Sequence, residues 1–237
     1  MTPFPNKVLI AGATRGVGLH VLGRLARRGV ACRVLVRDRG RAEGLGEVEI
    51  VKGDALDGAA CARAVEGCDA VICTIGERRV PKDRPIVDGD GVINLAEAAV
   101  AAGARRLVLV STLGSGESWG WLPFFVKGFF HAFRVLPILA EKTRSDAHVR
   151  TLDLDWTILW PAYLTNRPMR EPPLLTVDGR AGGTTSRQAV ADVAVRCLAS
   201  PNAVGRTIVV VDPAMRFTLS HGGPFELDAP WKAWAEA

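Results

Sequence analysis

Apolar positions along this chain follow two alternating patterns. Short continuous apolar runs, typical of buried strands, are separated by longer stretches in which apolar residues recur every three or four positions, as on one face of a helix. The runs that predict strands are residues 8–11, 31–36, 48–51, 70–74, 107–111, 156–160, 174–177 and 207–211. The stretches that predict helices are residues 17–28, 59–66, 87–102, 139–150 and 187–199, the last with Ser186 as its N-cap.

Strands that alternate with helices predict an α/β fold. Helical crossovers between parallel strands are right-handed, so helices cover both faces of the sheet. We expect a Rossmann-type, doubly wound and mainly parallel sheet with a small substrate-side region in its C-terminal part. The 237 residues suit a single domain, 1–237, because the sequence shows no internal repeat or linker. Ligands of such sheets bind beyond the carboxyl ends of the strands.

A glycine-rich turn follows the first predicted strand. Residues 7–18 read Lys-Val-Leu-Ile-Ala-Gly-Ala-Thr-Arg-Gly-Val-Gly, where Gly12 allows a tight exit from the strand. Gly16 and Gly18 remove side chains where a pyrophosphate and the packed strand would collide with them, and the free N–H groups of the next helix face the phosphate. The turn predicts a dinucleotide site, the alternative being an ordinary turn with incidental glycines. The contacts expected from it are Gly12, Thr14, Arg15, Gly16, Val17 and Gly18.

The residue after the second predicted strand indicates which nicotinamide cofactor is bound. An acidic side chain there accepts a hydrogen bond from the ribose 2′-hydroxyl of NAD, whereas an arginine accommodates the 2′-phosphate of NADP. The strand at 31–36 runs into Arg37, and Arg15 in the glycine turn can approach the same phosphate. Asp38 is the competing signal, because Arg37 can instead form a surface ion pair with it. We therefore expect NADP(H) as the cofactor.

Two further segments fit the adenine and nicotinamide halves of a dinucleotide. Asp54 and Ala55 follow the third predicted strand, where a carboxylate can accept from the adenine amino group. Asp54 also suits a cap or turn before the next helix, and the two roles are compatible. Thr74, Ile75 and Gly76 follow the fourth predicted strand, where a small residue lets the backbone lie against the cofactor. The alternative for these three residues is a plain strand-exit turn.

The net positive charge of the chain does not by itself indicate a nucleic-acid partner. The net charge is +5 and the pI is about 9.2. The arginines are dispersed, and neither a recognition helix nor an RNA-binding signature is present. We expect a solvated basic surface that partly serves anionic ligands, and no nucleic-acid partner.

The sequence also indicates the redox state of the cysteines, the absence of a metal site and the absence of a membrane segment. The five cysteines show no ligand spacing, which favours reduced, mostly buried thiols in a cytoplasmic protein. His20, His148 and His221 form no cluster with cysteines or carboxylates, so we expect no metal site. The sequence has no apolar stretch of 18 residues, and its first seven residues lack the apolar segment of a signal peptide. We expect a cytoplasmic protein without integral membrane association.

Segments along nearly the whole chain recur together in one protein family. They are Ala-Gly-Ala-Thr-Arg-Gly-Val-Gly at 11–18, Val-Leu-Val-Arg-Asp at 34–38, Gly-Asp-Ala-Leu at 53–56, Val-Leu-Val-Ser-Thr at 108–112, Leu-Asp-Trp-Thr-Ile-Leu-Trp-Pro at 154–161 and Ser-Arg-Gln-Ala-Val-Ala-Asp-Val-Ala at 186–194. The combination resembles the atypical short-chain dehydrogenase/reductase superfamily, especially its NmrA-like NAD(P)-binding group, which includes biliverdin-IXβ/flavin reductase. The resemblance implies a Rossmann-type sheet, NADP binding and a cytoplasmic location. It does not fix a substrate.

The resemblance also implies candidate catalytic residues. Better-known members reduce carbonyl groups with a Tyr-x-x-x-Lys pair and a serine after the fifth strand. Ser111 matches the serine and Lys142 the lysine, but the residue four before Lys142 is Ile138, which cannot transfer a proton. The remaining cofactor contacts expected at the strand ends are Ser111, Thr112, Lys142, Pro161 and Ala162.

The biliverdin/flavin-reductase branch suggests a chemistry that does without the tyrosine. Its acceptors are conjugated, so charge that arrives with the hydride is delocalised and a proton can come from solvent. Ser111 would donate a hydrogen bond at the nicotinamide end. Tyr163, the only tyrosine, falls where that branch has an active-site histidine. Packing against the following loop is the alternative role for Tyr163.

An aromatic segment at 119–139 has several possible roles. Phe125, Phe129 and Phe133 recur on one helical face, which Phe124 and Phe130 widen. Core packing comes first, a hydrophobic lid over the substrate second, and a subunit interface or membrane-surface contact third. We expect the segments at about 113–139 and 161–185, the latter as an active-site loop, to form the substrate side.

These observations lead to one expected function and two rivals. We expect an NADPH-dependent oxidoreductase that transfers hydride to a planar conjugated small molecule of the flavin, quinone or enone type, acting as a monomer or homodimer. A regulator that senses NADP(H) without turnover is one rival. The other is a non-redox isomerase or cyclase of a biosynthetic pathway on the same fold.

Overall fold

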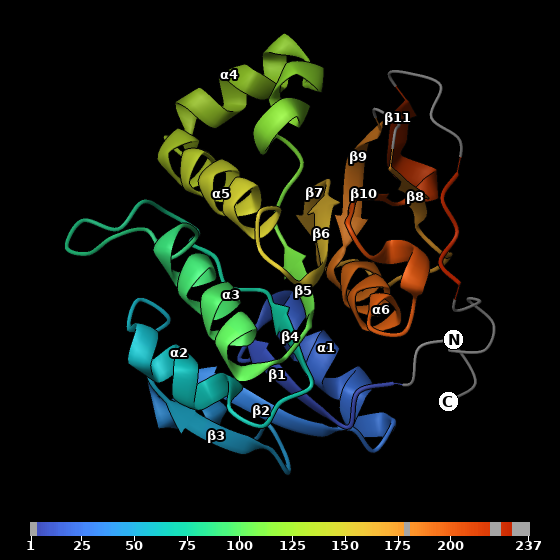
Figure 1. The fold of residues 1–237 in the computed structure, drawn as a ribbon. Coiled ribbons are helices and arrows are strands. Elements are labelled where there is room, and N and C mark those ends of the chain that lie inside the picture. The colour runs from blue at the N-terminus through green and yellow to red at the C-terminus, as the bar shows by residue number, and fades with distance from the viewer. Residues whose placement is uncertain (1–3, 178–180, 219–223, 229–237) are drawn as a thin grey trace.

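The computed structural model describes residues 4–177, 181–218 and 224–228, and most of its elements fall close to the predicted segments (Figure 1). The strands are β1 (Lys7–Ala11), β2 (Ala31–Val36), β3 (Glu49–Lys52), β4 (Ala70–Cys73), β5 (Arg106–Val110), β6 (Asp155–Pro161), β7 (Tyr163–Thr165), β8 (Leu174–Thr176), β9 (Ala181–Ser186), β10 (Arg206–Val211) and β11 (Arg216–Thr218). The helices are α1 (Gly16–Arg27), α2 (Gly58–Val65), α3 (Asp90–Ala102), α4 (Phe124–Ala132), α5 (Leu136–Val149) and α6 (Arg187–Cys197). Short 3-10 helices lie at η1 (Arg39–Ala42), η2 (Gly116–Trp121), η3 (Pro201–Ala203) and η4 (Pro213–Met215).

The strands confirm the predicted fold class. Within the described residues they form an eight-stranded sheet in the order β3-β2-β1-β4-β5-β6-β10-β8 and a three-stranded sheet in the order β11-β9-β7. Neighbours pair in parallel from β3 to β10, and β8 joins β10 antiparallel. The large sheet is therefore the doubly wound, mainly parallel sheet of the Rossmann type.

Helices cover both faces of the large sheet, and each face has its own core. Helices α1 and α6 pack together on one face, and α2, α3 and α5 lie on the other (Figure 1). Along β1, Val8 and Ile10 belong to the first core, whereas Leu9 and Ala11 belong to the second. This alternation follows from the two-residue period of a strand, and burial on both faces explains why the run is continuously apolar.

The chain departs from the prediction between β4 and α3. The helix predicted from residue 87 begins at Asp90, because residues 74–89 form the connection between the strand and the helix. Within this connection, Asp88 accepts a hydrogen bond from the Glu77 N–H at 2.8 Å. The prediction of a helix over 87–89 was therefore wrong.

The segment at 161–185, expected as a loop, contains strands. The three-residue strand β7 pairs with β9, and β9 also pairs with β11. Strand β9 reads Ala-Gly-Gly-Thr-Thr-Ser and has no apolar run. Because this small sheet forms through pairing between segments distant in the sequence, local hydropathy could not predict it.

The aromatic segment is only partly core, which corrects the leading expectation. Phe124 is 86% exposed, and Phe125 and Phe133 are 62% and 63% exposed. Phe130 is half-buried and packs edge-on against Trp119 with ring centroids 5.9 Å apart. The Phe129 side chain lies outside the described part of the structure. Helix α4 lies beyond the end of α5, away from both sheets (Figure 1), so the exposed rings have no sheet face beneath them.

The cysteines and the helices can be compared with the expectations from the sequence. All five cysteines of the chain lie among the described residues, and they are buried and free, as predicted. Among the described residues, none of the helices is both long and apolar enough to span a membrane. His221 lies outside the described residues, so the expectation made for it stays a prediction.

Candidate functional site

A pocket of about 380 Å³ opens at the carboxyl ends of β1, β2, β4 and β5. Ligands bind at this edge in sheets of this type. The predicted residues that line it are Gly12, Thr14, Arg15, Gly16, Val17, Arg37, Asp54, Ala55, Thr74, Ile75, Gly76, Ser111, Thr112 and Lys142. The structure thus brings together residues that lie more than 120 positions apart in the sequence, from Gly12 to Lys142.

The glycines of the turn between β1 and α1 are required by its geometry. Gly12 and Gly16 have φ angles of +93° and +60°, the left-handed region that favours glycine. A Cβ atom on Gly12 would lie 2.6 Å from Thr74 Oγ1, and one on Gly18 would lie 2.2 Å from the carbonyl oxygen of Gly12. The Thr74 hydroxyl donates to the carbonyl of Ala11 at 3.0 Å. The turn therefore packs against its own backbone and against the end of β4.

Helix α1 directs its first turn at the pocket. Gly16 and Val17 both line it. Within the described part of the chain, the side chain of the N-cap residue Arg15 makes no capping hydrogen bond. The first N–H groups of a helix lack partners inside the helix and carry partial positive charge. A phosphate would satisfy them, so the turn fits a pyrophosphate group.

Arginine side chains line the pocket at the end of β2. Arg37 follows this strand directly, and Arg41 reaches the same edge from η1. Asp38 is the N-cap of η1, because its Oδ1 accepts a hydrogen bond from the Gly40 N–H at 3.0 Å. Asp38 is not among the described residues that line the pocket. The positive charge at this edge suits a dianionic group.

Asp54 follows β3, where it has the predicted turn role and also lines the pocket, while its contact with an adenine stays a prediction. Its Oδ1 accepts a hydrogen bond from the Leu56 N–H at 3.1 Å, which makes it a turn residue before α2. Asp57 is the N-cap of that helix and accepts from the Ala59 N–H at 3.0 Å. Because Asp54 also lines the pocket, the turn positions it for a ligand.

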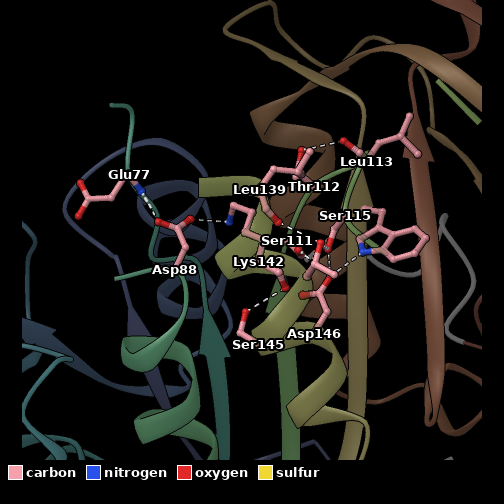
Figure 2. A network of polar contacts seen from close by, with 12 residues as sticks. Glu77, Asp88, Ser111, Thr112, Leu113, Ser115, Leu139, Lys142, Ser145 and Asp146 are labelled. Atoms are coloured by element: carbon pink, nitrogen blue, oxygen red, sulfur yellow. Dashed lines mark hydrogen bonds and ion pairs between the residues drawn. The ribbon is translucent and has the colours of Figure 1, made fainter. Parts of the chain in front are cut away.

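Lys142 reaches the pocket from α5 and is held by a buried carboxylate. Its Nζ atom lies 2.8 Å from Oδ1 of Asp88, a fully buried residue (Figure 2). Gly76 packs against this ion pair, since a Cβ atom there would lie 3.1 Å from Asp88 Oδ1. One turn before Lys142, Ile138 is buried with 6% of its surface exposed. The ion pair therefore holds the lysine in place, and the buried side chain four residues before it is a hydrocarbon.

Ser111, which follows β5, belongs to a buried network centred on Asp146 of α5. Its hydroxyl donates to Asp146 Oδ2 at 2.9 Å (Figure 2). The same oxygen accepts from the Ser115 hydroxyl at 2.7 Å and from the Trp160 Nε1–H at 2.9 Å. Among the described residues, Asp146 Oδ1 is buried and has no hydrogen-bond partner.

The surroundings of Asp146 shift its proton equilibrium. The residue is 2% exposed, and this burial raises the pKa of its carboxyl group. The hydrogen bonds from Trp160, Ser115 and Ser111 lower the pKa, as does the positive charge of Lys142, but burial has the larger effect. Asp146 therefore holds a proton to higher pH than an exposed aspartate.

Several predicted residues lie outside the pocket. Gly18, Pro161, Ala162 and Tyr163 are not among the described residues that line it. Tyr163 is 68% exposed on β7, whereas the next residue, Leu164, lines the pocket. Successive side chains of a strand point to opposite faces, so Tyr163 points away. The expected grouping of Tyr163 with Ser111 and Lys142 is not seen.

The expected substrate-side segments contribute little to this pocket. Of the described residues at 113–139 and 161–185, Leu164 lines it. Residues 178–180 of the second segment lie outside the described residues.

Sequence reasoning missed several pocket residues. They are Arg41, Glu77, Arg78, Leu164 and Arg187, together with Asp146 behind Ser111. Arg187 directly follows the predicted N-cap Ser186, and its Nη1 donates to Asn166 Oδ1 at 2.8 Å. The capping signal at Ser186 could have drawn attention to it, because the first turn of a helix often binds anions. No local sequence signal indicated Asp146, because its hydrogen-bond donors come from the loop after β5 and from β6.

The chain is similar to several known proteins. A model of a family described as NAD(P)H-binding matches residues 12–201. An uncharacterised chloroplastic protein of Arabidopsis thaliana is 30% identical over 223 residues, covering 87% of this chain and 76% of that protein. A (4-alkanoyl-5-oxo-2,5-dihydrofuran-3-yl)methyl phosphate reductase of Streptomyces griseus is 39% identical over 112 residues, covering 46% of this chain and 36% of the reductase.

A solved structure supports the fold assignment. ChuY, described as an anaerobillin reductase from Escherichia coli O157:H7, matches with a TM-score of 0.77 and 24% sequence identity. The match covers 88% of this chain and 98% of that one. At this identity the likeness shows the fold.

The contact between Gly18 and Gly12 predicts the effect of a single methyl group. Gly18→Ala places a Cβ atom against the Gly12 carbonyl oxygen, and we expect it to lower the free energy of unfolding by about 1–3 kcal/mol. Gly23→Ala on the same helix is the control, because among the described residues its Cβ would meet only the Arg27 guanidinium, at 3.7 Å. This control is expected to be neutral or to stabilise by up to about 1 kcal/mol. Urea denaturation measures both, and equal stability of the two variants would contradict the packing described.

Proposed function

The chain belongs to the NAD(P)H-binding family, and from this premise we propose that it is an NADPH-dependent oxidoreductase that delivers hydride to a conjugated acceptor. The membership agrees with the resemblance to atypical short-chain dehydrogenases/reductases, and reductases occur among the relatives. The chain spans little more than a third of the length of the Streptomyces griseus reductase and of a second Streptomyces reductase, so their activities are not assigned to it.

One observation carries the proposal. A single pocket joins the arginines after β2, the first turn of α1 after β1, and Ser111 and Lys142 beyond the ends of β4 and β5. These groups suit, in the same order, a phosphorylated ribose, a pyrophosphate and a reactive ring. When bound, a reduced nicotinamide cofactor supplies a hydride to the acceptor.

The arginines favour NADP(H) over NAD(H). Arg15, Arg37 and Arg41 line the same pocket, whereas Asp38 caps η1 and is not among the described residues that line it. Guanidinium groups bind phosphate through paired, charge-assisted hydrogen bonds. The adenosine 2′-phosphate is the group we assign to them.

The residues near Ser111 favour a conjugated acceptor. Lys142, held by Asp88, and Ser111 both line the pocket, and we assign the lysine to a ribose hydroxyl and the serine to the acceptor. Ile138 stands where the family resemblance places the tyrosine that protonates a ketone, so this pocket has no tyrosine for a localised alkoxide at that position. A flavin, quinone or enone spreads the arriving charge over its conjugated system. We propose such a planar small molecule as the partner, in the cytoplasm, where free buried thiols are stable.

Two other functions predict different behaviour towards acceptors. A regulator that senses NADP(H), or a non-redox isomerase or cyclase, would bind NADPH and leave it unoxidised. Ile138 is the residue that favours these alternatives, because it removes the usual acid.

Absorbance at the reduced-nicotinamide band tests the proposed function. With FMN or a simple quinone as acceptor, we expect the protein to oxidise NADPH catalytically, because a conjugated acceptor needs no tyrosine. Protein-free reactions control for direct transfer. Tight NADPH binding without turnover on any of these acceptors would reject the oxidoreductase and favour its rivals.

Replacement of Arg37 tests the choice of cofactor. Loss of charge-assisted hydrogen bonds to a phosphate costs about 1.5–3 kcal/mol, so Arg37→Ala should weaken NADPH binding about 10- to 100-fold and NADH binding much less. Arg39→Ala is the control, since Arg39 is exposed, lies two residues away and is not among the described residues that line the pocket. Fluorescence titration gives both dissociation constants. Equal weakening of NADPH and NADH by Arg37→Ala would reject the assignment.

Tyr163 is the proton donor that the sequence suggested, and its replacement tests that role. Because its side chain points away from the pocket, we expect Tyr163→Phe to turn over as the wild type does. Removal of a general acid instead slows a reaction about 10²–10⁴-fold. A steady-state loss of that size would return Tyr163 to the reacting centre.

A further inference from the structure

Asp146 is a buried carboxyl group next to the pocket wall. Its Oδ2 atom accepts hydrogen bonds from Ser111, Ser115 and Trp160, and of these Ser111 lines the pocket in the described part of the chain. Its Oδ1 atom is buried and without a hydrogen-bond partner among the described residues. Figure 2 shows the carboxyl group beneath Ser111 and Ser115, on the helix that also carries Lys142.

The protonation of Asp146 decides what Ser111 offers to the pocket. An ionised carboxylate only accepts, so Ser111 donates its hydrogen to Oδ2 and presents lone pairs to the pocket. A protonated carboxyl group can donate to Ser111 Oγ, which frees the Ser111 hydrogen to point into the pocket.

The buried, unpartnered Oδ1 atom favours the protonated form. Burial removes the hydration of this oxygen, and no donor among the described residues replaces it. The free-energy cost of this desolvation is much larger for an ionised carboxylate than for a neutral carboxyl group. Burial raises the pKa of Asp146 in the same direction.

We propose that Asp146 supplies a proton through the Ser111 hydroxyl to the reduced acceptor, in place of the absent tyrosine. The proposal rests on the proposed oxidoreductase function. Ser111 contacts the acceptor, whereas Asp146 acts through Ser111.

The relay balances in protons and charge. As the acceptor gains a hydride, the O–H bond of Ser111 breaks and its proton passes to the negatively charged acceptor. The O–H bond of Asp146 breaks in turn, and that proton restores the Ser111 hydroxyl. Asp146 is left as a carboxylate that still accepts hydrogen bonds from Ser115 and Trp160. A proton from water reloads it after the product leaves.

The charges around the network support this exchange. The charged groups that face Asp146 or its donors are Lys142 on the same helix, Asp88 paired with Lys142, Arg150 over the Trp160 ring, and Glu117 paired with Arg150. On the neighbouring helix α3, Asp90 and Glu97 pair with Arg144 and His148 at the surface. Lys142 is the group whose charge acts on Asp146 directly, and it stabilises the carboxylate once the proton has left.

Asp146→Asn removes the transferable proton with little change in shape. Single-turnover rates with NADPH and a reducible acceptor should fall about 10²–10⁴-fold, and the solvent deuterium isotope effect of the wild type should disappear. Ser111→Ala interrupts the same path from the other side and should lose the isotope effect as well. Asp192→Asn is the matched control, because Asp192 also has a buried oxygen without a hydrogen-bond partner among the described residues but lies in α6, where its other oxygen pairs with Arg24. We expect it to keep the wild-type rate and isotope effect.

A second readout needs neither cofactor nor acceptor. If the folded protein keeps Asp146 protonated above the unfolded pKa of about 4, it loses stability relative to Asp146→Asn as pH rises from there to the raised folded pKa. The ratio of the unfolding constants, wild type to variant, should then rise up to about tenfold per pH unit. A protonated-carboxyl infrared band that remains when the spectrum of Asp146→Asn is subtracted from that of the wild type should be present over the same range.

The outcomes separate the relay from the function on which it rests. A ratio that does not change with pH, with no protonated carboxyl band, overturns the relay, because Asp146 is then ionised throughout. A wild type that turns over as fast as Asp146→Asn overturns the relay alone. A wild type that binds NADPH and reduces no acceptor overturns the oxidoreductase and the relay together. Loss of rate and isotope effect in both Asp146→Asn and Ser111→Ala, with Asp192→Asn unaffected, supports the relay.

Discussion

The close contact between the glycine turn and the end of β4 is the constraint on which the pocket depends. Gly12 and Gly18 leave no space for a Cβ atom, because Thr74 and the turn's own backbone lie within van der Waals distance. This packing brings β1, β4 and the first turn of α1 to one point at the edge of the sheet. The first turn of α1, to which the Arg15 side chain makes no capping hydrogen bond in the described part of the chain, thereby lines the pocket, where a phosphate can satisfy its N–H groups.

Two buried carboxyl groups then position the polar side chains at the other end of the pocket. Asp88 forms an ion pair with Lys142, so both charges are compensated. Asp146 holds Ser111 by accepting a hydrogen bond from the neutral hydroxyl of that residue. The other carboxyl oxygen of Asp146 has no hydrogen-bond partner among the described residues. A paired carboxylate fixes a cation in place, whereas a poorly compensated carboxyl group is one that gains and loses a proton. The same kind of side chain thus serves positioning in one case and proton supply in the other.

The sequence predicted most of the large sheet and the glycine turn, because buried parallel strands and phosphate-binding turns have strong local signals. It missed β7, β9 and β11, since strands of three residues or with paired glycines form only through tertiary pairing. The prediction that the aromatic face of α4 packs in the core was wrong for its exposed rings, because hydropathy does not distinguish an exposed aromatic helix from a buried one. Arg41 and Asp146 escaped notice because their roles depend on neighbours distant in the sequence. The predicted roles of Pro161, Ala162 and Tyr163 stay predictions, with the three residues outside the pocket.

A crystal structure of the complex with NADP⁺ tests the central claim most directly, namely that one pocket aligns a whole dinucleotide from the arginines after β2 to Ser111. The account predicts the 2′-phosphate against Arg37 and Arg41, the pyrophosphate at the first turn of α1, and an accessible nicotinamide ring beside Ser111. A dinucleotide bound with its nicotinamide end away from Ser111, or with that ring covered by the aromatic residues of 124–133, would contradict it.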